Sequence, residues 1–382
     1  MTVILIVERV LHDEMGHFPG QIRSIANFSV AEDIHIITWT GLGELPASAQ
    51  PAQRPERVQV HRVFASSSEV TKSTDQPALV ESEAKSLTNI ASNIGATSGD
   101  TIVIPSASKH DLRIALALQN DSGPRVVARI LTLSILDDLS APNRDALRKC
   151  QMDGRIHLSC ETEEMQSAVR EKFDIHCPSD FVLPCSVLSG DDVPDHVQGV
   201  SFRVGMLGGP RGEKGSFRLP SIVRSIAAQS SKMKDAPKVT LVIQASLKFR
   251  MRTLSMLVQL LRAKLTPGNP CVEIIWGTQS GEDYRRALFG LDCVLLPYRL
   301  DRYATSGSGV VIDAVNAEVP VIRTRGMAMS QCLSFGNGIE AATDDEFAAA
   351  ILEMAVQPAQ FRQAAKQARD AMQARAADLP FV

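Results

Sequence analysis

Two cations lie three residues apart in a glycine-rich stretch, "GGPRGEKG" (208–215). The apolar run "FRVGML" leads directly into this stretch, as a buried strand leads into a loop. Glycines allow the main chain to approach a ligand closely. A guanidinium chelates phosphate oxygens, and an ammonium adds a mobile point charge. We therefore expect Arg211 and Lys214 to bind a diphosphate beside Gly208 and Gly209, with a solvated turn as the alternative.

A second segment, "SGSGVVID", offers a complementary set of groups. A helix is expected to begin near Ser308, and free N–H groups at a helix N-terminus bind anions. One turn further along, the carboxylate of Asp313 could accept hydrogen bonds from ribose hydroxyls. The alternative is an ordinary serine N-cap with a solvated Asp313. The expected ligand-binding residues of this segment are Ser306, Gly307, Ser308, Gly309 and Asp313.

Neither segment is a standard nucleotide motif. GxxxxGK[ST] is absent, so there is no Walker A loop, and "GSGVVID" lacks the third glycine and the early-strand context of GxGxxG. No DxD sequence follows a strand, so we expect no metal site and no cofactor.

Charge is distributed unevenly along the chain. Residues 1–196 carry 17 Lys and Arg against 27 Asp and Glu, a net charge of −10, and residues 197–382 carry 23 against 16, a net of +7. An anionic ligand is therefore expected mainly on the second half. Aromatic residues make up only 5% and no basic stripe is interleaved with them, which argues against nucleic acid as a partner.

The elements that would position these residues alternate between strands and helices, twice over. Strand-like runs alternate with helical patterns such as "RMRTLSMLVQLLRAKL", and this alternation is typical of parallel sheets wound by right-handed crossovers. We expect an α/β protein with two Rossmann-like domains facing a cleft, joined within residues 182–201. The expected strands are 3–7, 33–39, 57–64, 101–106, 125–131, 155–160, 202–207, 238–244, 271–277, 292–298 and 319–324.

These segments together resemble a known enzyme family. The loop "GGPRGEKG", then "LDCVLLPY", "SGSGVVIDA" and "VPVI" resemble the donor domain of GT-B glycosyltransferases, and are similar to the retaining enzymes of glycosyltransferase family 4. The resemblance covers residues 202–326, with support from 158–185; residues 1–150 match in layout only. It implies an acceptor domain (1–196), a donor domain (197–360) and a C-terminal helix (361–382) that crosses back to the first domain.

The resemblance also assigns roles to residues. Arg211 and Lys214 match the cations that hold the nucleoside diphosphate, and Asp313 takes the place of the second glutamate of the E-x7-E motif, which binds ribose. The first glutamate would fall at Thr305, so that half of the motif is missing.

In the first domain, the resemblance implies that Gly16 lies near the donor phosphates, and that His17 contacts the acceptor hydroxyl or the transferred sugar. His110 and Arg129 are expected at the acceptor pocket. Their alternatives are a capping or surface histidine for His17, a helix cap for His110 and a structural salt bridge for Arg129.

The function implied is transfer of a sugar from a nucleotide-diphosphate sugar to a glycan or glycoconjugate, with retention and without metal. A catalytically silent GT-B subunit that binds nucleotide or a partner protein is one alternative, and a sugar-nucleotide epimerase of similar architecture is another. Seven scattered cysteines without a CxxC pair indicate reduced thiols and a cytoplasmic protein. We expect no strong membrane association, because the first half is acidic; a homo-oligomer remains open.

Overall fold

The computed structural model describes residues 2–11, 18–51, 55–65, 77–118, 123–183, 199–209, 211–245, 251–264, 270–277 and 279–381. The chain divides into two compact units. The N-terminal unit comprises Met1–Cys185, Thr305–Gly307 and Ala374–Val382, and the C-terminal unit comprises Ser186–Ala304 and Ser308–Gln373. The expected domain boundary between residues 196 and 197 lies outside the described residues.

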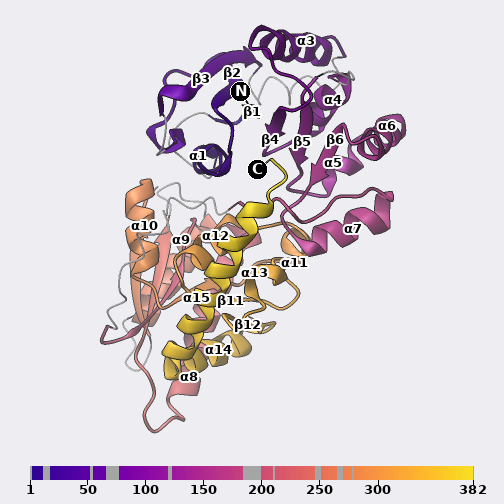
Figure 1. Ribbon diagram of the computed structural model, residues 1–382. Helices are drawn as coiled ribbons and strands as arrows, with labels where there is room; N and C mark the ends of the chain where they lie inside the picture. The colour runs from indigo at the N-terminus through magenta and orange to yellow at the C-terminus, as the bar shows by residue number, and fades with distance from the viewer. Residues whose placement is uncertain are drawn as a thin grey trace. The chain divides into compact units, whose positions relative to one another are not determined.

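The described strands of the N-terminal unit form one parallel sheet (Figure 1). Its strand order is β3-β2-β1-β4-β5-β6, and every neighbouring pair is parallel. This is the order of the Rossmann fold, in which the strand order reverses between the first and fourth strands. The strands are β1 (Val3–Val7), β2 (Asp33–Trp39), β3 (Val58–Phe64), β4 (Thr101–Ile104), β5 (Arg125–Arg129) and β6 (Ile156–Ser159).

Local capping explains where several helices of this unit begin. Ser108 and Asp111 form a capping box at α4, and the side chain of Thr162 accepts a hydrogen bond from the Met165 N–H at α7. Each satisfies N–H groups that the first helical turn leaves without a partner. The helices are α1 (Phe18–Phe28), α3 (Pro77–Asn93), α4 (Lys109–Ala117), α5 (Ser134–Asp137), α6 (Ala141–Met152) and α7 (Glu163–Phe173).

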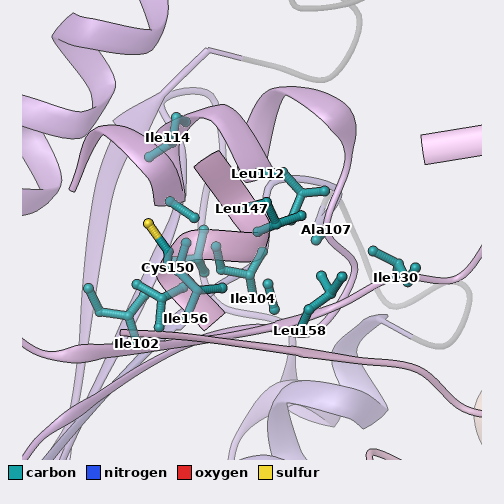
Figure 2. Packing of buried hydrophobic residues seen from close by; sticks show 14 of the residues in the cluster. Ile102, Ile104, Ala107, Leu112, Ile114, Ile130, Leu147, Cys150, Ile156 and Leu158 are labelled. Carbon is teal, nitrogen blue, oxygen red and sulfur yellow. The ribbon is translucent and has the colours of Figure 1, made fainter. Parts of the chain in front are cut away.

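The core of the N-terminal unit fills the space between the sheet and its helices. Figure 2 shows Ile102 and Ile104 of β4 gathered with Leu112 of α4 and Leu147 of α6. These side chains are at most 2% exposed. Full burial of one such side chain stabilises the fold by about 1.5–3 kcal/mol, so this packing fixes the sheet on which β5 and β6 present their ends.

The C-terminal unit repeats the same topology. Its described strands have the order β12-β11-β10-β7-β8-β9, which is again the Rossmann order counted from β7. All neighbouring pairs are parallel. The strands are β7 (Phe202–Met206), β8 (Val239–Ala245), β9 (Cys271–Trp276), β10 (Cys293–Leu296), β11 (Val321–Thr324) and β12 (Gly338–Ala341).

Helices connect these strands, and some connections begin with 3-10 turns. Two such turns, η3 (Gly212–Lys214) and η4 (Ser216–Arg218), follow β7, and α10 begins at a capping serine, Ser280, whose Oγ accepts from the Asp283 N–H. The helices are α8 (Leu219–Ser230), α9 (Met251–Lys264), α10 (Gly281–Phe289), α11 (Leu300–Tyr303), α12 (Gly309–Asn316), α13 (Ser330–Leu333), α14 (Asp344–Val356) and α15 (Pro358–Arg375).

The end of the chain is shared between the units. Helix α15 belongs to the C-terminal unit as far as Gln373, and Ala374–Val382 belong to the N-terminal unit. There, the ring of Phe381 lies 5.1 Å from that of Phe181, and Arg125 donates a hydrogen bond to the Pro380 carbonyl. The expected segment 361–382 is thus divided between the two units, and its role as a helix that crosses back to the first domain stays a prediction. In the described part of the chain, no helix combines the length and apolar character needed to cross a bilayer.

Candidate nucleotide-sugar site

The topology of the C-terminal unit brings the two sequence-predicted segments to one edge of its sheet. Strands β7 and β10 are hydrogen-bonded neighbours, and the strand order reverses between them. In open α/β sheets, ligands bind outside the carboxyl ends of the strands at this switch point. The loop with Arg211 and Lys214 follows β7, and the segment that leads to Asp313 follows β10.

The loop after β7 is held in place by a buried glutamine. Gln244, at the end of β8, accepts a hydrogen bond from the Gly208 N–H (2.7 Å) and donates one to the Gly277 carbonyl (3.1 Å). Gly208 has φ of 92°, a left-handed conformation that favours glycine, and a Cβ there would collide with the Lys214 ammonium. The left-handed backbone therefore favours glycine at this position, and the Lys214 ammonium occupies the space that a side chain would fill.

Lys214 lies inside the loop and not on its surface. The residue is 6% exposed, its Nζ donates to the Gly208 carbonyl at 3.3 Å, and Nζ lies 5.7 Å from the centre of the Tyr298 ring. The pKa of Lys214 is lowered from 10.5 to about 8, mainly by burial and also by the charge of Arg211, while the charges of Glu213 and Asp313 partly offset this lowering. A buried ammonium that bears its charge at a cost is well suited to a ligand that supplies negative charge.

Arg211 has the opposite environment, although it belongs to the same motif. Its side chain is 60% exposed and lies 3.7 Å from Glu213. Its main chain is fixed, because its N–H donates to Ser216 Oγ (3.1 Å) and its carbonyl accepts from the same hydroxyl (3.2 Å). The loop thus holds the backbone of Arg211 firmly and leaves the guanidinium in solvent.

Asp313 lies on α12 and is engaged by a tyrosine from another helix. The hydroxyl of Tyr284, on α10, donates to Asp313 Oδ2 at 2.9 Å. The pKa of Asp313 is raised from 3.8 to about 7, because the effect of burial exceeds the opposing effects of the Tyr284 hydrogen bond and the Lys214 charge. Lys214 and Asp313 therefore lie close enough for each charge to act on the ionisation of the other.

The predicted serine-glycine segment is divided between the units. Ser308 is the N-cap residue of α12, without a side-chain cap hydrogen bond, and it is buried next to the exposed Gly309. Ser306 and Gly307, by contrast, belong to the N-terminal unit. In that unit, the Thr162 hydroxyl donates to the Thr305 carbonyl at 2.5 Å, and a Cβ on Gly307 would collide with the Glu161 carboxylate.

Arg129, predicted at the acceptor pocket, is 1% exposed at the end of β5. It donates to the Pro105 carbonyl (2.7 Å) and to Glu161 (2.7 Å), and it also bonds Gln21. These contacts match the structural salt bridge that the sequence left as the alternative. An acceptor contact by Arg129 stays a prediction.

His110, the other predicted acceptor residue, lies in the first turn of α4. Its Nε2 is 2.7 Å from Glu83, which also binds the buried Arg9, and Arg9 in turn bonds Asp111. His110 is thus part of a mostly buried ionic network, and its acceptor role likewise stays a prediction. Gly16 and His17 lie outside the described residues.

Three residues of this site, Gln244, Tyr284 and Tyr298, were not predicted from the sequence. Gln244 carried a weak signal, because it is a polar residue at the end of the apolar run "VTLVI". Tyr284 carried none, since only the fold brings α10 next to α12. Within the described ranges, no group of three or more His, Cys, Asp or Glu residues could hold a metal ion.

The chain is similar along nearly its full length to solved glycosyltransferases. A glycosyltransferase from Rickettsia africae matches 99% of this chain and 94% of its own, with 11% identity and a TM-score of 0.61. HepE from Anabaena, solved in complex with UDP and glucose, matches over 100% and 97%, with 14% identity and a TM-score of 0.61. A trehalose-6-phosphate synthase from Burkholderia multivorans matches over 100% and 96%, with 12% identity and a TM-score of 0.64. By sequence, no protein-family profile and no characterised protein matches. The likeness confirms the predicted GT-B fold class of two Rossmann-like units.

Proposed function

We propose that this chain, which has the GT-B fold, is a glycosyltransferase that moves a sugar from a nucleoside-diphosphate sugar to a carbohydrate or glycoconjugate. The observation that carries the proposal is the buried ammonium of Lys214 at the switch point of the sheet, on the same edge as Arg211 and Asp313. Similarity in fold to HepE, solved with UDP and glucose, supports a nucleotide sugar as the donor.

The chemistry follows from where charge develops. The bond between the sugar's anomeric carbon and the diphosphate breaks, the diphosphate leaves with the electron pair, and the oxygen of an acceptor hydroxyl forms the new bond to that carbon. The hydroxyl proton passes to the departing diphosphate. Lys214, Arg211 and the first N–H groups of α12 stabilise the departing negative charge. Loss of a single such group typically costs about 2–4 kcal/mol of transition-state stabilisation. Membership of glycosyltransferase family 4, retention and independence of metal are parts of this proposal.

Asp313 would bind the ribose of the donor. An ionised carboxylate accepts hydrogen bonds from hydroxyl groups and is worth more than a neutral acceptor. Lys214 and Asp313 lie near enough for the charge of one to act on the other, so a single ligand can contact both. In the proposed complex, Lys214 binds the diphosphate and Asp313 binds the ribose attached to it.

The test is a thermal-shift screen of UDP, GDP and ADP and of their glucose derivatives, followed by a donor-hydrolysis assay. We expect one base to stabilise the protein, its diphosphate more strongly than its monophosphate, and slow release of sugar from the matching donor. Binding without any turnover, with or without added carbohydrate acceptors, would favour the silent-subunit alternative suggested by Thr305. Absence of binding by every nucleotide would refute the proposal.

A further inference from the structure

We propose that Tyr284 is a positioning residue for Asp313: its hydroxyl holds the carboxylate so that an aspartate, one methylene shorter than glutamate, still presents an oxygen to ribose. The inference rests on the proposed function, because it assumes that Asp313 binds a nucleoside. It adds a residue that the sequence motif does not contain, from a helix that lies before the motif in the chain.

Tyr284 is well placed to act as a fixed donor. Helix α10 begins at Ser280, whose Oγ accepts from the Asp283 N–H at 3.1 Å, and the Tyr284 N–H donates to the Ser280 carbonyl at 2.9 Å. The tyrosine thus belongs to the first, capped turn of the helix. A tyrosine side chain has only two χ angles, so fixing the position of its hydroxyl costs little conformational entropy.

In this proposal the two oxygens of the Asp313 carboxylate have different hydrogen-bond partners. Tyr284 occupies Oδ2 at 2.9 Å, and Oδ1 can then accept from a ribose hydroxyl. A hydrogen bond to a carboxylate also favours its ionised form. This matters for Asp313, because its pKa is raised to about 7 by burial even with the Tyr284 hydrogen bond and the Lys214 charge opposing that rise.

Those two groups come from α10 and from the loop after β7. Without the Tyr284 hydroxyl, the pKa of Asp313 rises further, so more of the protein carries a neutral carboxyl at pH 7. The carboxyl also loses its fixed orientation. Both effects weaken nucleoside binding, and the first depends on pH.

The experiment measures the affinity of the full-length protein for the nucleoside diphosphate selected from UDP, GDP and ADP, by calorimetry from pH 5.5 to 8.5. In Tyr284→Phe we expect about tenfold weaker binding at pH 7, which corresponds to the ~1.4 kcal/mol of one hydrogen bond to a charged group. The gain in affinity that follows ionisation of Asp313 should come at higher pH in Tyr284→Phe than in the unmodified protein, so the ratio of the two affinities narrows toward pH 8.5. Deprotonation of Lys214, whose pKa is about 8, lowers both affinities alike. Arg286→Gln is the control, because Arg286 is an exposed residue of the same helix; its curve should match that of the unmodified protein.

A double-mutant cycle separates positioning from a merely structural link between α10 and α12. Glutamate is one methylene longer, so Asp313→Glu should bind the nucleotide with little dependence on Tyr284. Tyr284→Phe should then change affinity less than about twofold in the Asp313→Glu background, against about tenfold with Asp313 present.

Two results would overturn the inference alone. One is Tyr284→Phe that is less stable but binds with unchanged affinity and pH profile, as a structural link would predict. The other is an equal loss of affinity in the Asp313→Glu background. An unmodified protein that binds no nucleoside diphosphate would overturn the proposed function, and this inference with it.

Discussion

Replacing Lys214 by methionine separates what this residue does for the ligand from what it costs the free protein. Methionine keeps an unbranched apolar side chain against Tyr298 and the Gly208 carbonyl, and it removes the charge. Because Lys214 is almost fully buried, the structure predicts opposite effects on stability and on binding. The substitution should stabilise the free protein and weaken nucleotide binding.

The stability effect follows from the pKa of Lys214, which lies at about 8 in the folded protein against 10.5 for an ordinary lysine. At ~1.36 kcal/mol per pH unit, keeping the ammonium charged in the fold costs on the order of 3 kcal/mol. A base with a lowered pKa destabilises the fold fully below its folded pKa, and the cost disappears as pH rises toward its unfolded pKa. Lys214→Met should therefore gain about 1–3 kcal/mol at pH 7, and its advantage should shrink between pH 8 and 10.5.

The binding effect comes from the lost attraction to the diphosphate. Two unit charges about 4 Å apart interact by about 4 kcal/mol at an effective dielectric constant of about 20. We expect Lys214→Met to lose about 2–4 kcal/mol of that, or roughly 30- to 1,000-fold in affinity.

Denaturant unfolding at pH 7 and pH 10 measures the first effect, and calorimetric titration with nucleoside diphosphate measures the second. Lys214→Arg, which keeps a charge at the site, is the matched control and should not show the stability gain. A Lys214→Met protein that is less stable than the unmodified protein at pH 7 would refute the electrostatic argument. Unchanged nucleotide affinity would show that the diphosphate does not lie at Lys214.

Three further predictions concern Arg211, the need for a metal ion, and membrane binding. Arg211→Ala should weaken nucleotide binding by only about 1–2 kcal/mol, because the guanidinium is mostly exposed. Titrations at low and high salt should show that this loss of binding energy becomes smaller as salt screens the charge. A loss equal to that of Lys214→Met would contradict the expectation that the buried lysine contributes more than the exposed arginine. Turnover should be the same in EDTA as in added Mg²⁺ or Mn²⁺, since no DxD sequence follows a strand, and loss in EDTA that metal restores would show that a divalent ion is needed. Flotation with anionic liposomes at low salt should leave the protein unbound, because residues 1–196 carry a net charge of −10. In the basic stretch 143–155, Arg148 pairs with Asp145 and Arg155 pairs with Asp153, which reduces the positive charge available to a membrane. Co-flotation that is abolished by Arg144→Glu and Lys149→Glu would show that this basic stretch binds the membrane despite the net charge.

The alternation of apolar runs predicted most of the fold. The expected strands 3–7 and 33–39 coincide with β1 and β2, and the expected helix over 250–265 is α9. Continuous runs of aliphatic residues are distinctive because parallel strands are buried on both faces. Strand β12 was missed, since its four residues "GIEA" contain too few apolar side chains to stand out. It is also an edge strand, which needs less hydrophobicity than a central one.

The candidate site was predicted in its motif residues but not in their environments. In the sequence, Arg211 and Lys214 are two similar cations on one loop, yet the fold buries one and exposes the other. Gly215, which follows Lys214, has a φ of 69° and lies so close to the Pro297 carbonyl that a Cβ there would collide with it. It ends the 3-10 helix whose last residue is Lys214. This close approach depends on the segment after β10, which sequence spacing does not reveal.

The chain departs from the E-x7-E motif of the family it resembles at both glutamate positions, Thr305 and Asp313. Thr305, where the first glutamate would stand, is tied through its carbonyl to Thr162 of the N-terminal unit, and Gly307 leaves room for Glu161. The second position keeps a carboxylate, but a shorter one, and Tyr284 holds it. Under the proposed function, binding energy for the donor would be concentrated on the ribose-diphosphate end, at Asp313 and Lys214, because the sugar end lacks the motif's first carboxylate. It follows that affinity should depend on the nucleoside diphosphate far more than on the sugar attached to it, so UDP and UDP-glucose, or the matching pair for another base, should bind within about tenfold of each other.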